Sequence, residues 1–350
     1  MIKYRLATHE DNGQLIALTS SSGMPGKMSL RIDRNPDFFR INELRGETKV
    51  YVAVDGIKIV GSISVSDQTT FINKKILPLY YISDFKVAKA YRNQGIGLQL
   101  TNEVVKYLET QDADFAFLNV SKGNKRPFVF FKDRGHYPDF ESIGSFTTFQ
   151  YVGSKKYSNR TKYTITPEHP SEEIISFLNS YYSNKELSEV INADKLNGTE
   201  LYAIRDQNQI LAVMSIVDTM SMKQNVVLKM PWHLKTIISC FNIFSSWVNM
   251  SKLPKEHEGI KMIYIKYLAL KQYDKRLIAT FISFAKKIAY EKSYSFVSIS
   301  VHENDILLKH LPKFLRFSFH SVGMLVSMKN STKLMRIIKT GMPFRDYSAI

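Results

Sequence analysis

The spacing of apolar residues changes abruptly within the first half of the chain. Tyr80–Val87 is mostly aromatic and β-branched, which predicts a buried strand. Across Ile96–Leu108, apolar residues recur every three or four positions, which predicts an amphipathic helix. A turn with glycines at positions 95 and 97 joins the two elements. The pattern therefore predicts a strand–turn–helix unit.

The same two periodicities predict the remaining elements of the first half. Asp55-Gly56 separates two β-rich runs, Thr48–Val54 and Ile57–Ser64, which is typical of a hairpin. The other predicted elements are a strand and helix within residues 2–18, a helix from Asn35 to Leu44, and strands at Phe115–Val120 and Ile143–Val152.

After a polar, aperiodic stretch, Gly153–Arg160, the second half repeats this plan loosely. The predicted elements are helices at Ile174–Tyr182, Lys275–Lys292 and Ile306–Phe314, a hairpin of Glu200–Arg205 and Ile210–Val217, and strands at Met262–Leu270, Phe296–Val301 and Val322–Met328. We therefore expect an α/β protein of two domains, residues 1–153 and 161–350, with a linker between them.

The turn after Val87 has the properties of an anion site. The first N–H groups of a helix lack intrahelical partners, and the helix dipole is positive at this end. Glycine lets the backbone approach a phosphate without a Cβ in the way, and Arg92 adds a positive charge.

The motif R-x-x-G-x-G at Arg92–Gly97 resembles motif A of the GNAT superfamily of acetyl-CoA-dependent N-acetyltransferases. The opening residues, 2–18, resemble the family's first strand and helix, and Asn124–His136 resembles its motif B. The resemblance covers about 150 residues in the correct order. It implies tandem GNAT-like domains, each a mixed central sheet flanked by helices, with acetyl-CoA as co-substrate.

The resemblance also implies the cofactor contacts. The backbone of a splayed strand would bind the pantetheine arm and polarise the thioester carbonyl, and the loop would hold the pyrophosphate. Carried onto this chain, the cofactor-binding residues are Phe85, Lys86, Val87, Arg92, Asn93, Gln94, Gly95, Ile96, Gly97 and Asn124. We expect no metal.

The proton-transfer groups are less well defined. In the family, a tyrosine of motif B donates a proton to the departing CoA thiolate. The corresponding position of this chain holds Phe131, which has no proton to donate. Asp84, on the predicted strand, is our choice of general base, with a structural carboxylate as the open alternative. His136 is a further candidate base, although a core histidine is favoured there. Arg31, Arg34 and Arg40 could bind an anionic group of the acceptor or be ordinary surface arginines.

The equivalent loop of the second half, Leu270–Arg276, contains no glycine. Side chains would crowd a phosphate there, and Asp274 would repel it. We therefore expect the second copy to have lost cofactor binding.

Composition is that of a globular protein, with 44% apolar and 23% charged residues. The net charge of +16 is divided into +4 for residues 1–153 and +12 for the rest. Basic excess favours anionic partners, but the lysines are scattered, so we expect a solvated basic surface rather than a nucleic-acid site. We expect a soluble, cytoplasmic protein without a membrane span. Cys240, the single cysteine, is predicted to be buried.

The apolar segment Met230–Met250 contains both tryptophans of the chain. We expect a packed core helix there. Two alternatives stay open, namely a cover over the acceptor cleft and contact with a membrane surface.

The sequence therefore predicts an N-acetyltransferase. Acetyl would pass from acetyl-CoA to a small-molecule or peptide amine by direct attack. The alternative is a non-catalytic acyl-CoA sensor or a scaffold protein. The acceptor itself is set by loops that no motif describes.

Overall fold

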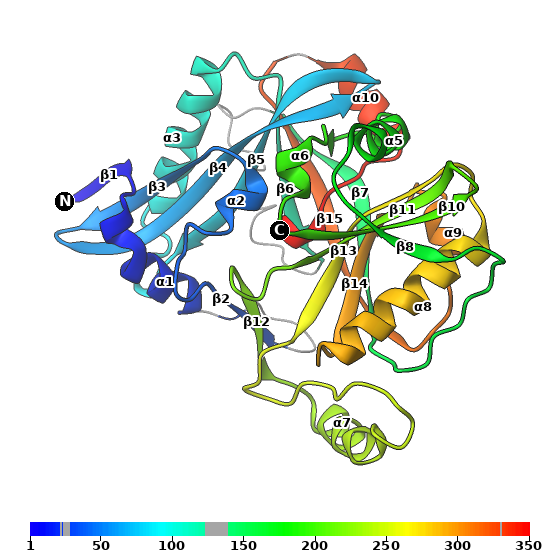
Figure 1. Ribbon diagram of the computed structural model, residues 1–350. Coiled ribbons are helices and arrows are strands. Elements are labelled where there is room, and N and C mark those ends of the chain that lie inside the picture. Colours follow the sequence, from blue (N-terminus) through cyan, green and yellow to red (C-terminus); the bar gives the residue numbers. More distant parts are fainter. Residues whose placement is uncertain (22, 24–28, 123–138, 330) are drawn as a thin grey trace.

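The structure is a computed structural model of the 350-residue chain, and it describes all residues except 22, 24–28, 123–138 and 330. In the described part, one long mixed β-sheet runs through both halves, with helices packed against it (Figure 1). A separate two-stranded sheet joins β2 (Ser29–Asp33) of the first half to β12 (Gln224–Lys229) of the second.

The first half consists of β1 (Ile2–Leu6), α1 (Asn12–Ser20), β2, α2 (Asn42–Arg45), β3 (Thr48–Asp55), β4 (Lys58–Ile72), β5 (Lys75–Val87), α3 (Ile96–Thr110), β6 (Phe115–Ser121) and β7 (Asp139–Val152). The second half consists of β8 (Ile165–Glu168), α5 (Glu172–Tyr182), β9 (Ser188–Glu189), α6 (Ala193–Leu196), β10 (Thr199–Asp206), β11 (Gln209–Asp218), β12, α7 (Trp232–Phe244), β13 (Met262–Leu270), α8 (Lys275–Glu291), β14 (Phe296–His302), α9 (Leu307–His310), β15 (Arg316–Ser327) and α10 (Thr332–Thr340).

One amphipathic helix in each half forms the main core with the sheet. The apolar stripe of α3, from Ile96 to Leu108, is buried against β3–β6. The stripe of α8, including Ile278, Phe281 and Ile282, is buried in the same way against β11, β13 and β14. Burial of the stripe, rather than helix propensity alone, fixes each helix on its sheet.

Two helices are shorter than predicted. The helix expected from Asn35 to Leu44 is confined to α2, because side-chain oxygens of Asn12 and Asp37 accept the N–H groups of Phe38 and Phe39. The helix expected at Ile306–Phe314 ends at His310. The next residue, Leu311, is extended and precedes a proline, a position that disfavours helical backbone.

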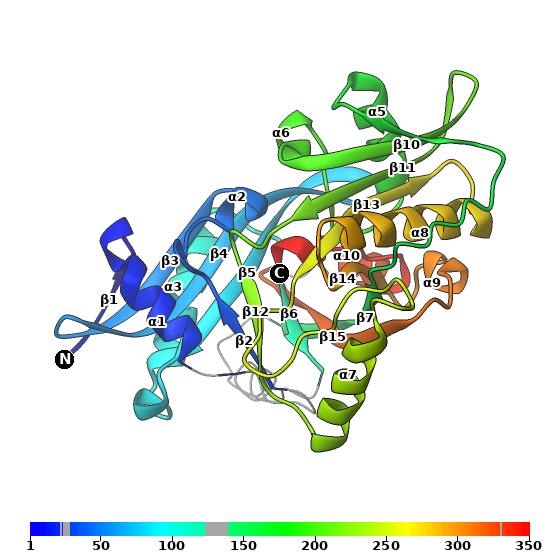
Figure 2. The same cartoon turned by 60° about the horizontal axis from the view of Figure 1, so that its bottom comes forward.

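The prediction of a packed core helix at Met230–Met250 is wrong. Only Ile238 of α7 is buried, and the helix lies at the edge of the molecule (Figures 1 and 2). Cys240 lies on this helix and is exposed, so the prediction of a buried cysteine is also wrong. No helix among the described residues is long and apolar enough to cross a membrane.

The two halves exchange their last strands. The sheet order is β1-β3-β4-β5-β6-β15-β7-β14-β13-β11-β10-β8. The strand β15 pairs with β6 of the first half, and this pairing covers the whole of β6, from Phe115 to Ser121. In turn, β7 of the first half pairs with β14 of the second, from Phe146 to Val152. Each half-sheet is therefore completed by a strand from the other half.

This exchange predicts how the chain tolerates a cut in the segment 154–160. Residues 1–153 alone would leave the β6 edge unpaired, so we expect that fragment to aggregate or remain unfolded. The fragments 1–153 and 161–350, expressed together, should co-purify and unfold in a single transition, measured by circular dichroism. A folded, monomeric 1–153 fragment with the stability of the full chain would contradict the exchanged pairing. The domain boundaries themselves remain a prediction.

Candidate functional site

The site lies where β5 and β6 diverge. These parallel strands pair at Tyr80–Ala116 and Tyr81–Phe117, the two ladder positions that the described residues show, although β5 continues to Val87. The second half repeats this geometry. There β13 and β14 pair in parallel from Met262 to Tyr264, and β13 then continues to Leu270. Each half thus contains a pair of parallel strands that separate towards their C-terminal ends.

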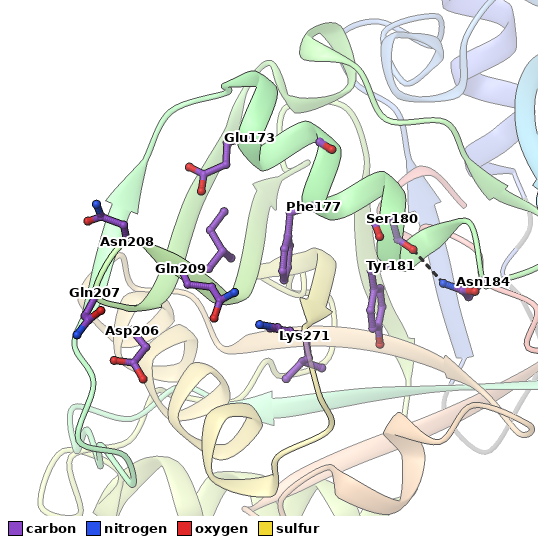
Figure 3. Close-up of a pocket in the computed structure, with 13 residues that line it drawn as sticks. Glu173, Phe177, Ser180, Tyr181, Asn184, Asp206, Gln207, Asn208, Gln209 and Lys271 are labelled. Atoms are coloured by element: carbon purple, nitrogen blue, oxygen red, sulfur yellow. Dashed lines mark hydrogen bonds between the residues drawn. The ribbon is translucent and has the colours of Figure 1, made fainter.

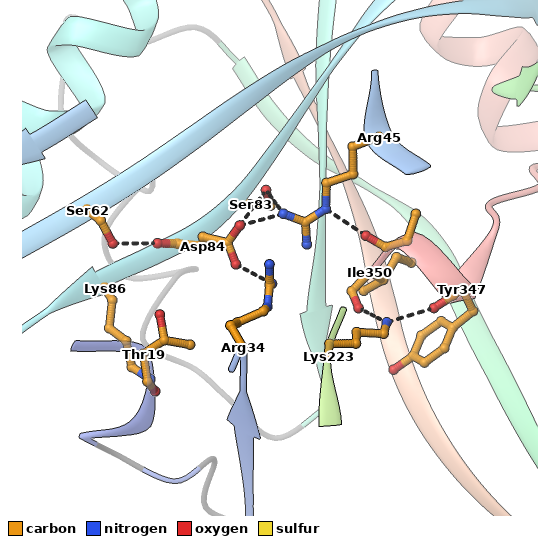
Figure 4. A network of polar contacts seen from close by, with 11 residues as sticks. Thr19, Arg34, Arg45, Ser62, Ser83, Asp84, Lys86, Lys223, Tyr347 and Ile350 are labelled. Carbon is orange, nitrogen blue, oxygen red and sulfur yellow. Dashed lines mark hydrogen bonds and ion pairs between the residues drawn. The ribbon is translucent and has the colours of Figure 1, made fainter. Parts of the chain in front are cut away.

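A β-bulge shapes the last part of β5. The register with β4 shifts between Ser62 and Ser64, so that Asp84 and Phe85 fall in the extra space on β5. Asp84 has φ of 49°, and the Ser62 hydroxyl donates to its carbonyl oxygen at 3.0 Å. The bulge directs the Asp84 side chain towards Arg34 and Arg45 (Figure 4).

The predicted anion loop follows β5 directly. Gly95 is the N-cap of α3, with φ of 76°, and it contributes no side-chain cap. No acidic residue lies in the first turn of this helix. A Cβ built on Gly95 would have no heavy atom within 4 Å, so the space above this residue is open. The loop therefore presents the N-terminus of a helix to the outside without a side chain over it.

The predicted loop residues differ in their exposure to solvent. Asn93, Gln94 and Gly95 are exposed, and Ile96 and Gly97 are buried in the first turn of α3. Arg92 is half-buried, and its Nε donates to the carbonyl of Val87 at 3.2 Å. This contact ties the loop to the end of β5.

The residues from Phe85 to Val87 are half-buried at the end of β5. Lys86 donates to the carbonyl of Thr19 in α1, and burial lowers the pKa of its ammonium group to about 8. Asn124, Phe131 and His136 lie outside the described residues.

The equivalent helix in the second half is capped by its own carboxylate. Asp274 is the N-cap of α8, and its side chain accepts from the N–H of Arg276 at 2.7 Å. A negative group already occupies the position that a phosphate would take. Next to it, the ring of Tyr273 stacks on His310, and its hydroxyl meets that of Tyr181 at 3.1 Å. This geometry disfavours an anion at the second loop, although loss of cofactor binding there remains a prediction.

Asp84 lies in a buried ion cluster. Its Oδ1 accepts from Arg34 Nη2 at 2.6 Å, and its Oδ2 accepts from Arg45 Nη1. The side chains of the two arginines are 2% and 1% exposed, and that of Asp84 is 9% exposed. Arg45 also donates from Nε to the carbonyl of Ala349 at 2.7 Å, which joins the cluster to the C-terminal segment (Figure 4).

The charges of this cluster are strongly coupled. Burial by itself would raise the pKa of Asp84, but Arg34 and Arg45 outweigh burial and hold that pKa well below its ordinary value. Burial lowers the pKa of Arg34 to about 10, so this side chain stays protonated at neutral pH. Lys223, which donates to the carbonyls of Tyr347 and Ile350, has its pKa lowered by burial and by the two arginines.

The prediction that Asp84 is the general base is not supported by this geometry. A carboxylate held by two arginines has little tendency to accept a proton, so the structural alternative fits better. Arg34, one of three arginines considered for the acceptor, is buried, whereas Arg40 is exposed and Arg31 pairs with Asp33 at 2.7 Å.

Sequence reasoning missed Arg45 and Lys223. Arg45 ends a four-residue helix, and Lys223 precedes β12 at a position 139 residues beyond Asp84. No local pattern distinguishes either of them from the other basic residues of this chain. A positive-φ bulge at Asp84 is equally invisible in the sequence.

The structure also has an open polar cavity of about 1060 Å³ in the second half (Figure 3). It lies between α5 and the β10–β11 turn, and its lining includes Glu173, Tyr181, Gln207 and Lys271. None of the predicted site residues that the structure describes lines it, so it is separate from the β5–α3 loop.

Comparisons with known proteins show what the chain is similar to. Residues 35–137 match the family model described as "Acetyltransferase (GNAT) domain". The L-2,4-diaminobutyric acid acetyltransferase of Shouchella clausii (strain KSM-K16) is 25% identical over 156 residues, which are 44% of this chain and 81% of that protein.

Two solved structures resemble nearly the whole chain. N-myristoyltransferase from Saccharomyces cerevisiae with bound myristoyl-CoA aligns with a TM-score of 0.61 and 12% identity, over 93% of this chain and 82% of that chain. A GCN5-related N-acetyltransferase from Anabaena variabilis ATCC 29413 aligns with a TM-score of 0.56 and 12% identity, over 94% and 73% of the two chains. At these identities the likeness concerns the fold. It covers more than nine tenths of this chain and therefore extends over both halves.

The family match, the related acetyltransferase and the fold agree with the resemblance seen in the sequence. The fold is that of acyltransferases that use acyl-CoA. The segment that contains β5 and α3 is thus similar to GNAT acetyltransferases in its sequence, and the chain as a whole is similar to them in its fold.

Proposed function

We propose that the first half of this protein binds acetyl-CoA and transfers its acetyl group directly to an amine. The observation that carries this proposal is the uncapped, glycine-started helix α3 at the open end of the β5–β6 pair, within the segment that matches the GNAT domain. The loop Arg92–Gly97 would hold the pyrophosphate, and the backbone of Phe85–Val87 would bind pantetheine and polarise the carbonyl. Asn124 would be a further contact to the pantetheine arm.

In this proposal the second half is a related unit that does not bind the cofactor. We take residues 1–153 and 161–350 as tandem GNAT-like units and assign cofactor binding to the first alone. The repeated divergence of parallel strands at β13–β14 supports the tandem relationship. The carboxylate cap of α8 supports loss of the second cofactor site. One equivalent of CoA per chain is therefore expected.

We assign Asp84 a positioning role. It fixes the guanidinium groups of Arg34 and Arg45 in a buried region next to the segment that would hold the thioester. Two nitrogens of Arg34, Nε and Nη1, are buried without a hydrogen-bond partner among the described residues. Buried donors of this kind favour an acceptor that carries a carboxylate, which a guanidinium binds well. The amino-acid substrate in the name of the related acetyltransferase is consistent with this choice.

Release of free CoA tests the proposal directly. Purified protein is incubated with acetyl-CoA and L-2,4-diaminobutyric acid, or with trimethylenediamine, which is the same diamine without the carboxylate. We expect acceptor-dependent thiol release, with kcat/KM at least about tenfold higher for the amino acid, the size of one lost charge-assisted hydrogen bond. Longer acyl-CoA donors, run in parallel, show whether acetyl is preferred.

The outcomes separate the competing functions. Binding of acetyl-CoA without acceptor-dependent release across a wider amine panel would favour a sensor or scaffold protein over an enzyme. Release with equal efficiency for both diamines would retain the acyltransferase but remove Arg34 as a carboxylate-binding residue.

A further inference from the structure

The α7 helix and the turn after it expose an unusual amount of apolar surface. Among the described residues, six of the 14 large hydrophobic side chains that are exposed lie within residues 232–248. They are Trp232, Ile237, Ile243, Phe244, Trp247 and Val248, with the two tryptophans 78% and 80% exposed. Because scattered exposed hydrophobics are normal but a contiguous patch is not, this segment requires a separate explanation.

The helix has two apolar faces, of which the protein covers one. Leu234, Ile238 and Phe241 recur at helical spacing and pack into a cluster with strands of the second half. Trp232 and Ile243 lie on the opposite face, about three turns apart, with Cys240 between them. Both ribbon views place α7 at the rim of the molecule (Figures 1 and 2). The outer face therefore points away from the core.

The surroundings of this surface are basic. No Asp or Glu occurs between Asp218 and Glu256, whereas this stretch contains five lysines. Four of the five are exposed, namely Lys229, Lys235, Lys252 and Lys255, and Lys235 pairs with Glu256 at 2.7 Å. Lys155, also exposed, lies beside the turn, since its N–H donates to the carbonyl of Asn249 at 2.9 Å.

We propose that this surface, residues 229–255, docks the protein onto a bilayer that contains anionic phospholipid headgroups. Exposed tryptophans flanked by lysines suit the interfacial region, where the rings lie at headgroup level and the ammonium groups meet phosphates. A 13-residue helix, about 20 Å long, is too short to cross a bilayer but can lie in its surface. Self-association through this surface would bring the lysines of two copies together, which disfavours a second copy as the occupant.

Tryptophan fluorescence reports on this surface alone, because Trp232 and Trp247 are the only tryptophans of the chain. The full-length protein is titrated with vesicles of phosphatidylcholine and with vesicles that also contain phosphatidylserine. With the mixed vesicles we expect a blue shift of the emission and protection from acrylamide quenching. Pure phosphatidylcholine should give at least about tenfold weaker binding, and added salt should weaken binding to the mixed vesicles.

Matched substitutions distinguish binding through this surface from nonspecific adsorption of the protein to vesicles. Ile243→Ser removes an apolar side chain that is 68% exposed on α7, and Ile57→Ser makes the same change at a 92% exposed site in the β3–β4 turn. Lys252→Glu on the proposed surface is paired with Lys333→Glu in α10, where the lysine is also exposed. We expect the α7-side variants to weaken vesicle binding about tenfold or more, and the controls to leave it unchanged.

Three results would overturn the proposal. The first is the absence of a spectral shift with phosphatidylserine vesicles. The second is equal loss of binding in the α7 variants and their controls. The third is a blue shift that depends on protein concentration without vesicles and is accompanied by dimers in analytical ultracentrifugation, which would assign the surface to a second copy. Retained CoA binding by the variants confirms that each is folded, so a failure here leaves the proposed acyltransferase unaffected.

Discussion

Replacing Gly95 with Asp is expected to weaken CoA binding on the order of 100-fold while the protein stays folded. The substitution puts a carboxylate at the N-cap of α3, next to the first-turn N–H groups that would hold the pyrophosphate. At a separation of about 5 Å and an effective dielectric constant of about 20, the repulsion is roughly 3 kcal/mol, or on the order of 100-fold in affinity. The dissociation constant, measured by isothermal titration calorimetry with CoA, should rise accordingly.

The matched control is Gly95→Asn. Asn and Asp have the same shape and both tolerate positive φ, so they should meet the 76° at this position at similar cost. A Cβ at position 95 has no neighbouring heavy atom within 4 Å, so neither side chain has to displace another group there. We expect the Asn variant to lose less than about tenfold in affinity, because it adds bulk without charge. Normal CoA binding by the Asp variant would show that the loop is not the pyrophosphate site.

Replacing Asp84 with Asn is expected to have the largest effect on stability. The change leaves two buried guanidinium groups, those of Arg34 and Arg45, without their shared carboxylate. Breaking a buried ion pair from one side costs about 3–5 kcal/mol. The free energy of unfolding, measured in urea by circular dichroism, should fall by that amount, and activity should fall with it because the arginines lose their fixed positions.

Asp33→Asn provides the comparison for this variant. Asp33 also pairs with an arginine, but the side chains of Arg31 and Asp33 are 34% and 14% exposed. A pair this accessible to water contributes about 0–1 kcal/mol, so the control should remain close to the parent protein. Equal stability losses in the two variants would argue against a special role for the buried cluster.

Acid stability gives a second measure of the Asp84 cluster. Because the folded-state pKa of Asp84 lies below its unfolded value of about 3.9, its contribution to stability is complete above that value. The contribution is lost as the pH falls from there through the folded-state pKa, where the unfolded chain binds the proton more readily. The parent protein should therefore lose stability more steeply in acid than Asp84→Asn. If the parent protein and Asp84→Asn lost stability equally steeply in acid, Asp84 would not be held ionised by the two arginines.

Local sequence determined the elements on either side of the proposed cofactor loop. A β-branched strand, a turn with glycine at position 95 and an apolar stripe over Ile96–Leu108 were sufficient to predict β5, α3 and the turn between them. Residues close in the chain carry these signals, and the periodicity of a strand or a helix is itself local. For the same reason the absence of glycine in Leu270–Arg276 indicated that the two loops differ.

Only the tertiary structure decided which residues meet across the molecule. Arg45 and Asp84 are 39 positions apart, and Arg45 also contacts Ala349, at the other end of the chain. The exchange of β7 and β15 involves pairing between residues 165 to 188 positions apart, from Arg316–Tyr151 to Ser327–Asp139, which each strand's own pattern leaves open. The apolar pattern of α7 was equally ambiguous, since periodicity shows that a face is apolar but not whether the protein covers it. Long-range packing supplies that information, and it fixed both the buried charge cluster and the exposed surface.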